Sequence, residues 1–376
     1  MVSARPPAPG DRHTPLRVPS AADGAGVGHY GRVTPQSCER CASTVFAESL
    51  QCPVCSAPVG FHPPTLSFRV LDGETVEIDG RTWAACSNRD WRCNWLAPRD
   101  EPSAQCFSCR LTRRRPPSDE TADLERLADA AVDKRRLLMQ LRYLGLPITP
   151  YYEREGGLAF DLLAGTPSEP VMIGHANGVI TIDLNETLDD RREGVRVRLG
   201  EAYRTMLGHF RHEIGHYYQG ILVDSDAAWA ECRALFGDER ASYQDAIDRH
   251  YRFGAPEGWA DSFISEYATM HPWEDFAECF AHYLHITATL ATAARGGVTL
   301  DAERVSGHSD ASVVPLEDYS AQPIDRMLDD WHWLSLLFNR VNRTMGKDDL
   351  YPFRISAPVA EKLAYVHRIV TRVAGS

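Results

Sequence analysis

Residues 208–219 read Gly-His-Phe-Arg-His-Glu-Ile-Gly-His-Tyr-Tyr-Gln and contain the pattern H-E-x-x-H, formed by His212, Glu213 and His216. Apolar residues recur around the pattern at helical spacing, which predicts an amphipathic helix. On such a helix the two histidines lie one turn apart on the same face, so they can bind one zinc ion together. Glu213 then lies beside the metal, where it can act as a general base toward water. The motif therefore predicts a catalytic zinc site.

A catalytic zinc needs a third protein ligand and one position left open for water. The metzincin pattern takes that ligand from a histidine six residues after the second motif histidine, but this chain has Leu222 there. Gln219 also occupies the position of the metzincin glycine, so this class is excluded. The best source of the third ligand is residues 267–285, where Pro272 suits the first turn of a helix.

Glu274 and Glu278 lie four residues apart in that segment, a pattern that resembles the gluzincin group of peptidases, including thermolysin-like and lethal-factor-like enzymes. The resemblance implies that Glu274 binds zinc and that Glu278 orients a ligand histidine through its other ring nitrogen, although the reverse assignment stays open. Tyr267 precedes Glu274 by seven residues, as a tyrosine does in lethal-factor-like enzymes. It is therefore expected to stabilise the oxyanion of the tetrahedral intermediate, with His271 as the alternative.

Eight of the ten cysteines fall in the first 110 residues and form four pairs. Two C-x-x-C pairs separated by ten residues are typical of a zinc ribbon. The sequence thus predicts two structural zinc sites, made of Cys38, Cys41, Cys52 and Cys55 and of Cys86, Cys93, Cys106 and Cys109. How the pairs share the two metals stays open, and a cross-braced arrangement is possible. With the catalytic site, the expected content is three Zn²⁺.

The first 35 residues contain proline, glycine and arginine but no apolar stretch that resembles a signal peptide. No segment of the sequence is apolar enough to span a membrane. Because zinc thiolates persist under reducing conditions, we expect a cytoplasmic protein with no membrane partner. The expected partner is a peptide or protein substrate.

Residues 81–115 are locally basic, with eight arginines against three acidic residues, although the whole chain carries a formal charge of −12. Aromatic residues interleave with these arginines, so nucleic-acid binding is one interpretation. Because the chain has only three lysines, arginine is its ordinary cation and the stretch carries little information. The alternative function is therefore a regulatory or binding protein whose zinc ribbons recognise nucleic acid or a protein, with a second domain that cleaves one partner or nothing.

Three regions follow from these patterns: a disordered tail (1–35), a zinc-ribbon-like module with two four-cysteine sites (36–115) and a zincin-like metallopeptidase domain with C-terminal helices (119–376). Within the last, helices are predicted over 124–144, 324–345 and 357–373, and a strand over 158–163. Asn177-Gly178 between two apolar runs predicts a β-hairpin. The predicted class is α+β, mainly helical with a small sheet.

Taken together, the chain resembles a bacterial family of zinc-binding metallopeptidases that joins a zinc-ribbon-like region to a zincin domain. The matching stretches are Cys52-Pro-Val-Cys55, Cys93-Asn-Trp-Leu96, Lys134-Arg-Arg-Leu137, His212-Glu-Ile-Gly-His216, His271-Pro-Trp-Glu-Asp275 and Asp349-Leu-Tyr-Pro-Phe353. The resemblance covers nearly all of the chain after residue 35. It implies a gluzincin-like fold and a catalytic zinc, and it supplies no substrate.

Overall fold

The computed structural model describes residues 36–117, 119–166, 168–187, 205–301, 304 and 312–374. They all belong to the second of two compact units, residues 34–376. A cysteine-rich region with small sheets precedes a mainly helical domain, which confirms the predicted α+β class. The expected tail, 1–35, lies outside the described residues. Among the residues that are described, no helix combines the length and the apolar character needed to cross a membrane.

The cysteine-rich region contains two small antiparallel sheets. One pairs β1 (Val59–His62) with β2 (Ser67–Val70), and the other consists of β3 (Thr75–Ile78), β4 (Arg81–Ala85) and β5 (Leu96–Pro98). A 3₁₀ turn, η1 (Arg89–Trp91), and the short helix α1 (Phe107–Arg110) complete it. The ring of Phe61 lies 5.0 Å from that of Trp95 and 5.5 Å from that of Phe68. This buried aromatic cluster supplies a core to a region too small to build a large one.

A four-stranded sheet lies in the helical domain, in the order β6 (Thr112–Arg114), β7 (Ala159–Leu163), β9 (Val179–Asp183) and β8 (Gly174–Ala176). The pairs β6–β7 and β7–β9 are parallel, whereas β8 runs antiparallel to β9 along the outer edge. Asn177 and Gly178 join β8 to β9 at φ angles of 50° and 81°. Only a residue that tolerates positive φ fits there, which confirms the predicted hairpin.

The strand β6 connects the two regions, because it begins three residues after Cys109 yet pairs with β7. Arg113 on β6 donates two hydrogen bonds to the buried Asp161 on β7, at 3.0 and 2.6 Å. The sheet of the helical domain thus starts within the stretch that we assigned to the zinc-ribbon-like module from the sequence.

The described residues of this domain form the helices α2 (Thr121–Tyr143), α4 (Met206–Leu222), α5 (Asp226–Phe236), α6 (Tyr243–Phe253), α7 (Pro272–Arg295), α8 (Ile324–Thr344) and α9 (Ala357–Ala374). Short 3₁₀ turns are η2 (Leu184–Thr187), η3 (Trp259–Asp261) and η4 (Tyr267–Thr269). The predictions for α2, α8 and α9 are correct to within three residues at each end. The sequence patterns did not predict α5 or α6.

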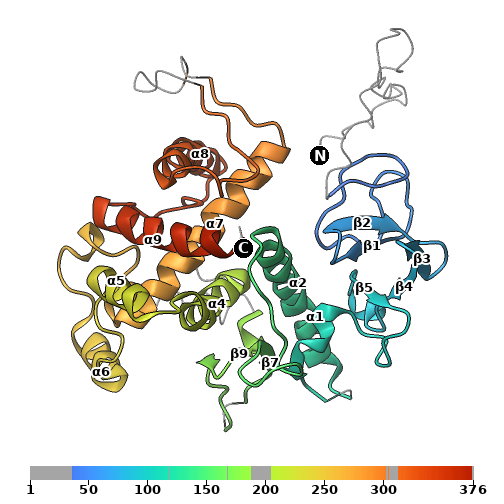
Figure 1. The fold of residues 1–376 in the computed structure, drawn as a ribbon, viewed down its shortest axis with the longest axis horizontal. Helices are drawn as coiled ribbons and strands as arrows, with labels where there is room; N and C mark the ends of the chain where they lie inside the picture. The colour runs from blue at the N-terminus through green and yellow to red at the C-terminus, as the bar shows by residue number, and fades with distance from the viewer. Residues whose placement is uncertain are drawn as a thin grey trace, which may run out of the picture. The chain divides into compact units, whose positions relative to one another are not determined.

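The helices α4 and α7 pack against each other at the centre of the domain (Figure 1). Gly215 on α4 faces α7 so closely that a Cβ atom there would lie 2.9 Å from the Cα of Ala277. A larger residue at this position would push the two backbones apart. One turn further on, the ring of Tyr218 stacks on Phe280 with centroids 5.6 Å apart. The glycine inside the H-E-x-x-H motif therefore brings the two helices that carry the site into contact.

Candidate metal centre

The helix α4 presents its motif residues toward α7. Thr205 caps its N-terminus by accepting a hydrogen bond from the backbone N–H of Gly208 at 2.9 Å. His212 and His216 then lie on one face, with ring centroids 4.9 Å apart. Glu213 and His216 are only 8% and 6% exposed, so the motif lies at a largely desolvated position.

The helix α7 brings Glu274 to the same point from the other side. Its Oε2 atom lies 2.9 Å from Nε2 of His212 and 3.4 Å from Nε2 of His216. The donor atoms of these three residues all lie within 4.8 Å of one another. Two imidazole nitrogens and one carboxylate oxygen, with room for a fourth ligand, are a donor set that suits a catalytic zinc. Glu274 itself is 2% exposed, so water does not solvate its charge.

Glu278, one turn along α7, contacts the opposite nitrogen of the same histidine. Its Oε1 accepts a hydrogen bond from Nδ1 of His212 at 2.7 Å, and its Oε2 accepts one from the hydroxyl of Ser265 at 2.6 Å. Burial opposes ionisation of Glu278, but the hydrogen bond and charge of His212, together with His282 and Ser265, outweigh it and hold the pKa of this carboxyl at about 2. A carboxylate on Nδ1 leaves Nε2 free for a metal. This geometry favours Glu274 over Glu278 as the metal-binding carboxylate.

Two side-chain atoms of the H-E-x-x-H residues have no hydrogen-bond partner among the described residues although both are buried. They are Oε2 of Glu213 and Nδ1 of His216. A buried carboxylate oxygen without a partner is costly in a finished protein interior. Here it lies on the residue that would accept a proton from water, so the arrangement suits a site that works with an additional group. The residues present therefore fit a zinc ion and its water.

Tyr243, on the unpredicted helix α6, also belongs to the site. Its hydroxyl donates a hydrogen bond to Oε1 of Glu274 at 2.7 Å, so each oxygen of that carboxylate has a separate contact. Burial and the adjacent Glu274 charge raise the pKa of Tyr243 above its usual 10, which keeps the hydroxyl protonated and able to donate. Trp273 packs on His216 with ring centroids 4.6 Å apart. No sequence pattern marks Tyr243, which lies 31 positions from Glu274 in the chain.

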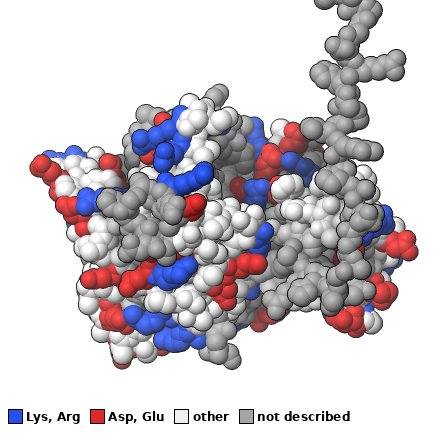
Figure 2. Space-filling view, turned by 90° about the horizontal axis from the view of Figure 1, so that it is seen from above, with Lys and Arg blue, Asp and Glu red and all other residues white. Residues whose placement is uncertain are grey.

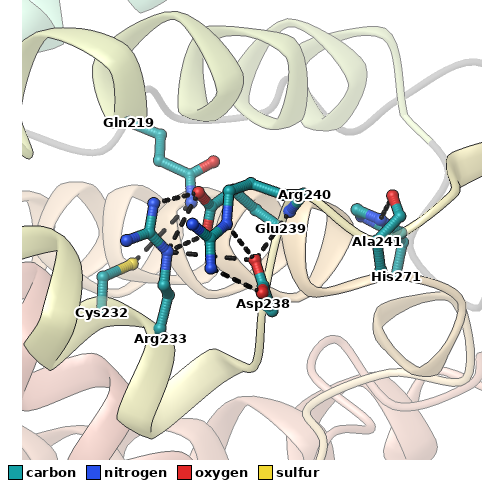
Figure 3. A network of polar contacts seen from close by, with 8 residues as sticks. All are labelled: Gln219, Cys232, Arg233, Asp238, Glu239, Arg240, Ala241 and His271. Carbon is teal, nitrogen blue, oxygen red and sulfur yellow. Dashed lines mark hydrogen bonds and ion pairs between the residues drawn. The ribbon is translucent and has the colours of Figure 1, made fainter.

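The loop between α5 and α6, which precedes Tyr243 in the chain, carries a network of polar contacts (Figure 3). Arg233 binds Glu239 at 2.6 Å, and Arg240 binds Asp238 at 2.8 Å. These contacts fix residues 237–242, which lead directly into Tyr243.

His271 also contacts this loop. Its Nε2 donates to the carbonyl of Ala241 at 3.1 Å, and its Nδ1 caps α7 by accepting from the N–H of Trp273 at 3.1 Å. Both ring nitrogens therefore contact backbone, and the alternative that gave His271 the oxyanion role fails on this geometry. The ring of Tyr267 lies beside the metal ligands instead, with its centroid 5.6 Å from that of His212.

The eight paired cysteines form two separate groups of four. The first is Cys38, Cys41, Cys52 and Cys55, and the second is Cys86, Cys93, Cys106 and Cys109. Two sulfur pairs of the first group and three of the second lie 3.5 to 3.7 Å apart, all sulfur atoms of a group lie within 4.8 Å of one another, and none forms a disulfide. A tetrahedral zinc with Zn–S bonds of about 2.3 Å requires S–S separations of roughly 3.8 Å. Each group therefore suits one structural zinc, and the pairing that the sequence left open follows chain order without cross-bracing.

A buried lysine of the helical domain supports the second group. Lys134 on α2 is 1% exposed, and its Nζ donates to the carbonyl of Ser108 at 2.8 Å and to the hydroxyl of Thr112 at 2.5 Å. Burial lowers the pKa of this ammonium, while the charges of Cys109 and Cys106 oppose that effect. Four thiolates around one Zn²⁺ carry a net charge of about −2, which a neighbouring cation stabilises.

The basic stretch 81–115 is largely neutralised by contacts within the protein. The ion pairs are Arg81–Asp100, Arg92–Asp129, Arg110–Glu101 and Arg113–Asp161, at 2.6 to 2.9 Å. Arg89 donates instead to the carbonyls of Leu50 and Val59. Figure 2 shows acidic and basic side chains mixed over the face drawn there, without a continuous basic track among the described residues.

Comparison with known proteins agrees with these features. Residues 123–369 match the family described as "Putative zinc-binding metallo-peptidase", and residues 36–120 match a zinc-ribbon domain. Uncharacterized proteins of Mycobacterium bovis and Mycobacterium tuberculosis are 43% identical over 341 residues, which cover 90% of this chain and 95% of each relative. No solved structure matches the chain. The chain therefore belongs to the zinc-binding metallo-peptidase family and carries that family's domain behind a zinc-ribbon domain.

Proposed function

We propose that this protein is a zinc-dependent, gluzincin-like endopeptidase with one catalytic and two structural zincs. His212, His216 and Glu274 would hold the catalytic zinc, and Glu213 would act as the general base. The observation that carries the proposal is the meeting of three metal-binding atoms within 4.8 Å beside the buried, unpartnered Oε2 of Glu213. A structural zinc site would have no use for that carboxylate, because it needs no proton acceptor.

Zinc in this site would supply a Lewis acid that polarises the scissile carbonyl and makes water more acidic. Glu213 takes the proton of the attacking water and delivers it to the leaving amine. Tyr267 donates a hydrogen bond to the oxyanion, the role that its place beside His212 supports. Glu278 fixes the ring of His212, and Tyr243 fixes the second oxygen of Glu274.

The edge strand β8 supports a peptide as substrate. Among the described residues it pairs only with β9, and it packs against α4. The ring of His175 on β8 lies 6.0 Å from that of Tyr217, the residue that follows the motif. An extended peptide can add to such an edge through main-chain hydrogen bonds, which would place one of its carbonyls at the metal ligands. None of the ten cysteines forms a disulfide, as expected in a reducing compartment, and we assign the protein to the cytoplasm.

The first experiment measures zinc per chain by mass spectrometry for wild type, His212→Ala and the control Glu257→Gln, which changes an exposed residue. The three ligand groups predict about three zincs for wild type and the control and about two for His212→Ala. A count that stays the same in His212→Ala would contradict a zinc site on α4.

Hydrolysis is tested separately with a quenched-fluorescent peptide library. Glu213→Gln should keep all of the zinc and lower the cleavage rate by at least about 10²-fold, because only the proton acceptor is lost. The control Glu257→Gln should cleave like wild type. Cleavage that survives in Glu213→Gln would refute the role of Glu213 without affecting the zinc assignment.

A further inference from the structure

The C-terminal half of α8 carries an apolar surface that no described element of the chain covers. Leu336, Leu337, Val341 and Met345 are 41%, 36%, 50% and 72% exposed. The N-terminal half of the same helix instead buries its apolar side, including Trp331, where α8 contacts α7 and α9 (Figure 1). Apolar side chains that gather on one exposed helix indicate a contact surface rather than scattered surface residues.

Five exposed residues lie along the outer side of this helix, which we name the α8 seam: Asp329, His332, Leu336, Leu337 and Arg340. Asp329, His332, Leu336 and Arg340 recur at spacings of three or four residues, which return to the same side of a helix at each step, and Leu337 flanks that line beside Leu336. The seam is acidic at its N-terminal end, apolar in the middle and basic at its C-terminal end. Neither Asp329 nor Arg340 forms a salt bridge with another described residue, although the Asp329 charge lies close enough to Arg326 to help raise the pKa of that guanidinium, so both can pair with charges of a partner.

The other two arginines beside the seam are already occupied. Arg326 binds Asp330 at 2.9 Å, and Arg343 binds Asp349 at 2.5 Å. Their charges are therefore compensated within the chain, and they contribute little to recognition. The charge pattern of the seam is set by one aspartate and one arginine, eleven residues apart on one side of the helix.

We propose that the α8 seam joins two copies of this chain, with their α8 helices antiparallel. A twofold axis midway between positions 334 and 335 places Asp329 of each copy opposite Arg340 of the other. The two Leu336 side chains then meet beside the axis. A parallel pairing would instead place like charges together, which is destabilising. The seam is thus complementary to itself in one orientation only, and this favours a second copy over an unrelated partner.

The contact should be weak and reversible. One helix from each copy buries less surface than the roughly 1,200 Å² of a small stable interface. Dissociation constants in the micromolar range are therefore expected, so the dimer must be sought over a range of protein concentrations. Because of the twofold symmetry, each substitution in the seam acts twice.

Sedimentation velocity of the full-length, zinc-loaded protein from about 1 to about 200 μM tests the proposal, a range chosen to span micromolar association. The variants are Leu336→Asp, Asp329→Arg, Arg340→Asp and the double charge swap Asp329→Arg with Arg340→Asp. The exposed residue Glu257, in the loop after α6, supplies the matched control Glu257→Arg. Circular dichroism and zinc content of each variant verify that it is folded.

Wild type and the Glu257→Arg control should dimerise alike, and Leu336→Asp should abolish the dimer. Each single charge reversal turns two attractive contacts into two repulsive ones and should raise the dissociation constant roughly 10- to 30-fold. The double swap should return it to within about threefold of wild type, because its charges are complementary again. A chain that stays monomeric at every concentration would overturn the proposal. So would a dimer that the single reversals do not weaken, since another face would then form it.

Discussion

The contact between Tyr243 and Glu274 allows a quantitative test of how the metal centre is supported. Substituting Tyr243→Phe removes only the hydroxyl, which donates to Oε1 of Glu274 at 2.7 Å. The ring should stay in place, because its packing against His271 and Trp273, with centroids 5.2 and 5.9 Å away, does not involve the hydroxyl. Glu274 is 2% exposed, so water cannot readily replace the lost donor.

The expected cost follows from the nature of that bond. A hydrogen bond to a buried carboxylate is charge-assisted, and loss of such a support for a metal ligand typically lowers metal affinity about 10- to 100-fold. This corresponds to roughly 1.4 to 2.7 kcal/mol of binding free energy. Without Tyr243, Oε1 of Glu274 can rotate toward the two histidines, and the ligand loses its fixed orientation.

Competition between the protein and a chromophoric zinc chelator measures this affinity independently of any peptidase activity. The difference between the zinc released by wild type and by His212→Ala identifies the zinc bound at the α4 site. The zinc of the two cysteine sites serves as an internal reference. Tyr251→Phe, at a position 66% exposed on the same helix, is the matched control and should bind zinc like wild type. If Tyr243→Phe keeps the wild-type affinity within about twofold, the reasoning about Glu274 is wrong.

Three further perturbations test other parts of the structure. Lys362 forms a 2.6 Å ion pair with the fully buried Asp275, so Lys362→Met should lower the free energy of unfolding, measured in urea, by about 3 to 5 kcal/mol. The double variant Lys362→Met with Asp275→Leu should recover most of that lost stability, because no unpaired charge stays buried. Lys134→Met should speed zinc loss from the second cysteine site to a chelator by about tenfold, with no change at the first site. Burial lowers the pKa of His62 from 6.5 to about 4, so the unfolded chain takes up a proton that the folded chain excludes. Stability should therefore fall by up to about 3 kcal/mol between pH 6.5 and 4 in urea titrations, and less in His62→Gln.

The sequence predicted those parts of the site that depend on local periodicity. The two motif histidines are four residues apart on a helix, and so are Glu274 and Glu278, so the shared face of each pair followed from helix geometry alone. The Asn177-Gly178 turn was equally local, because only residues that accept positive φ fit it.

The rest depends on contacts between segments that carry no periodic signal. Residues 225–253 have few buried apolar positions: α6 buries only Ala246, so its pattern resembled a loop. Tyr243 can contact Glu274 because ion pairs of Arg233 and Arg240 hold the loop before it. The spacing of residues along the sequence does not reveal such contacts. Similarly, β6 is three residues long and gains its stability from β7 rather than from its own sequence.

The structure also explains why a zinc ribbon and a metallopeptidase domain should occur in one chain. The strand that follows Cys109 forms one edge of the sheet that ends at β8, and Lys134 on α2 contacts the backbone between the last two cysteines. The helix α2 in turn packs on α4, where Gln140 accepts hydrogen bonds from Arg211, the residue before His212. A structural change at the second cysteine site can therefore be transmitted through α2 to α4, the helix that carries His212 and His216. The zinc-ribbon region thus packs against the domain that holds the candidate metal ligands, so loss of zinc from the second cysteine site should destabilise that domain even if the ribbon binds nothing else.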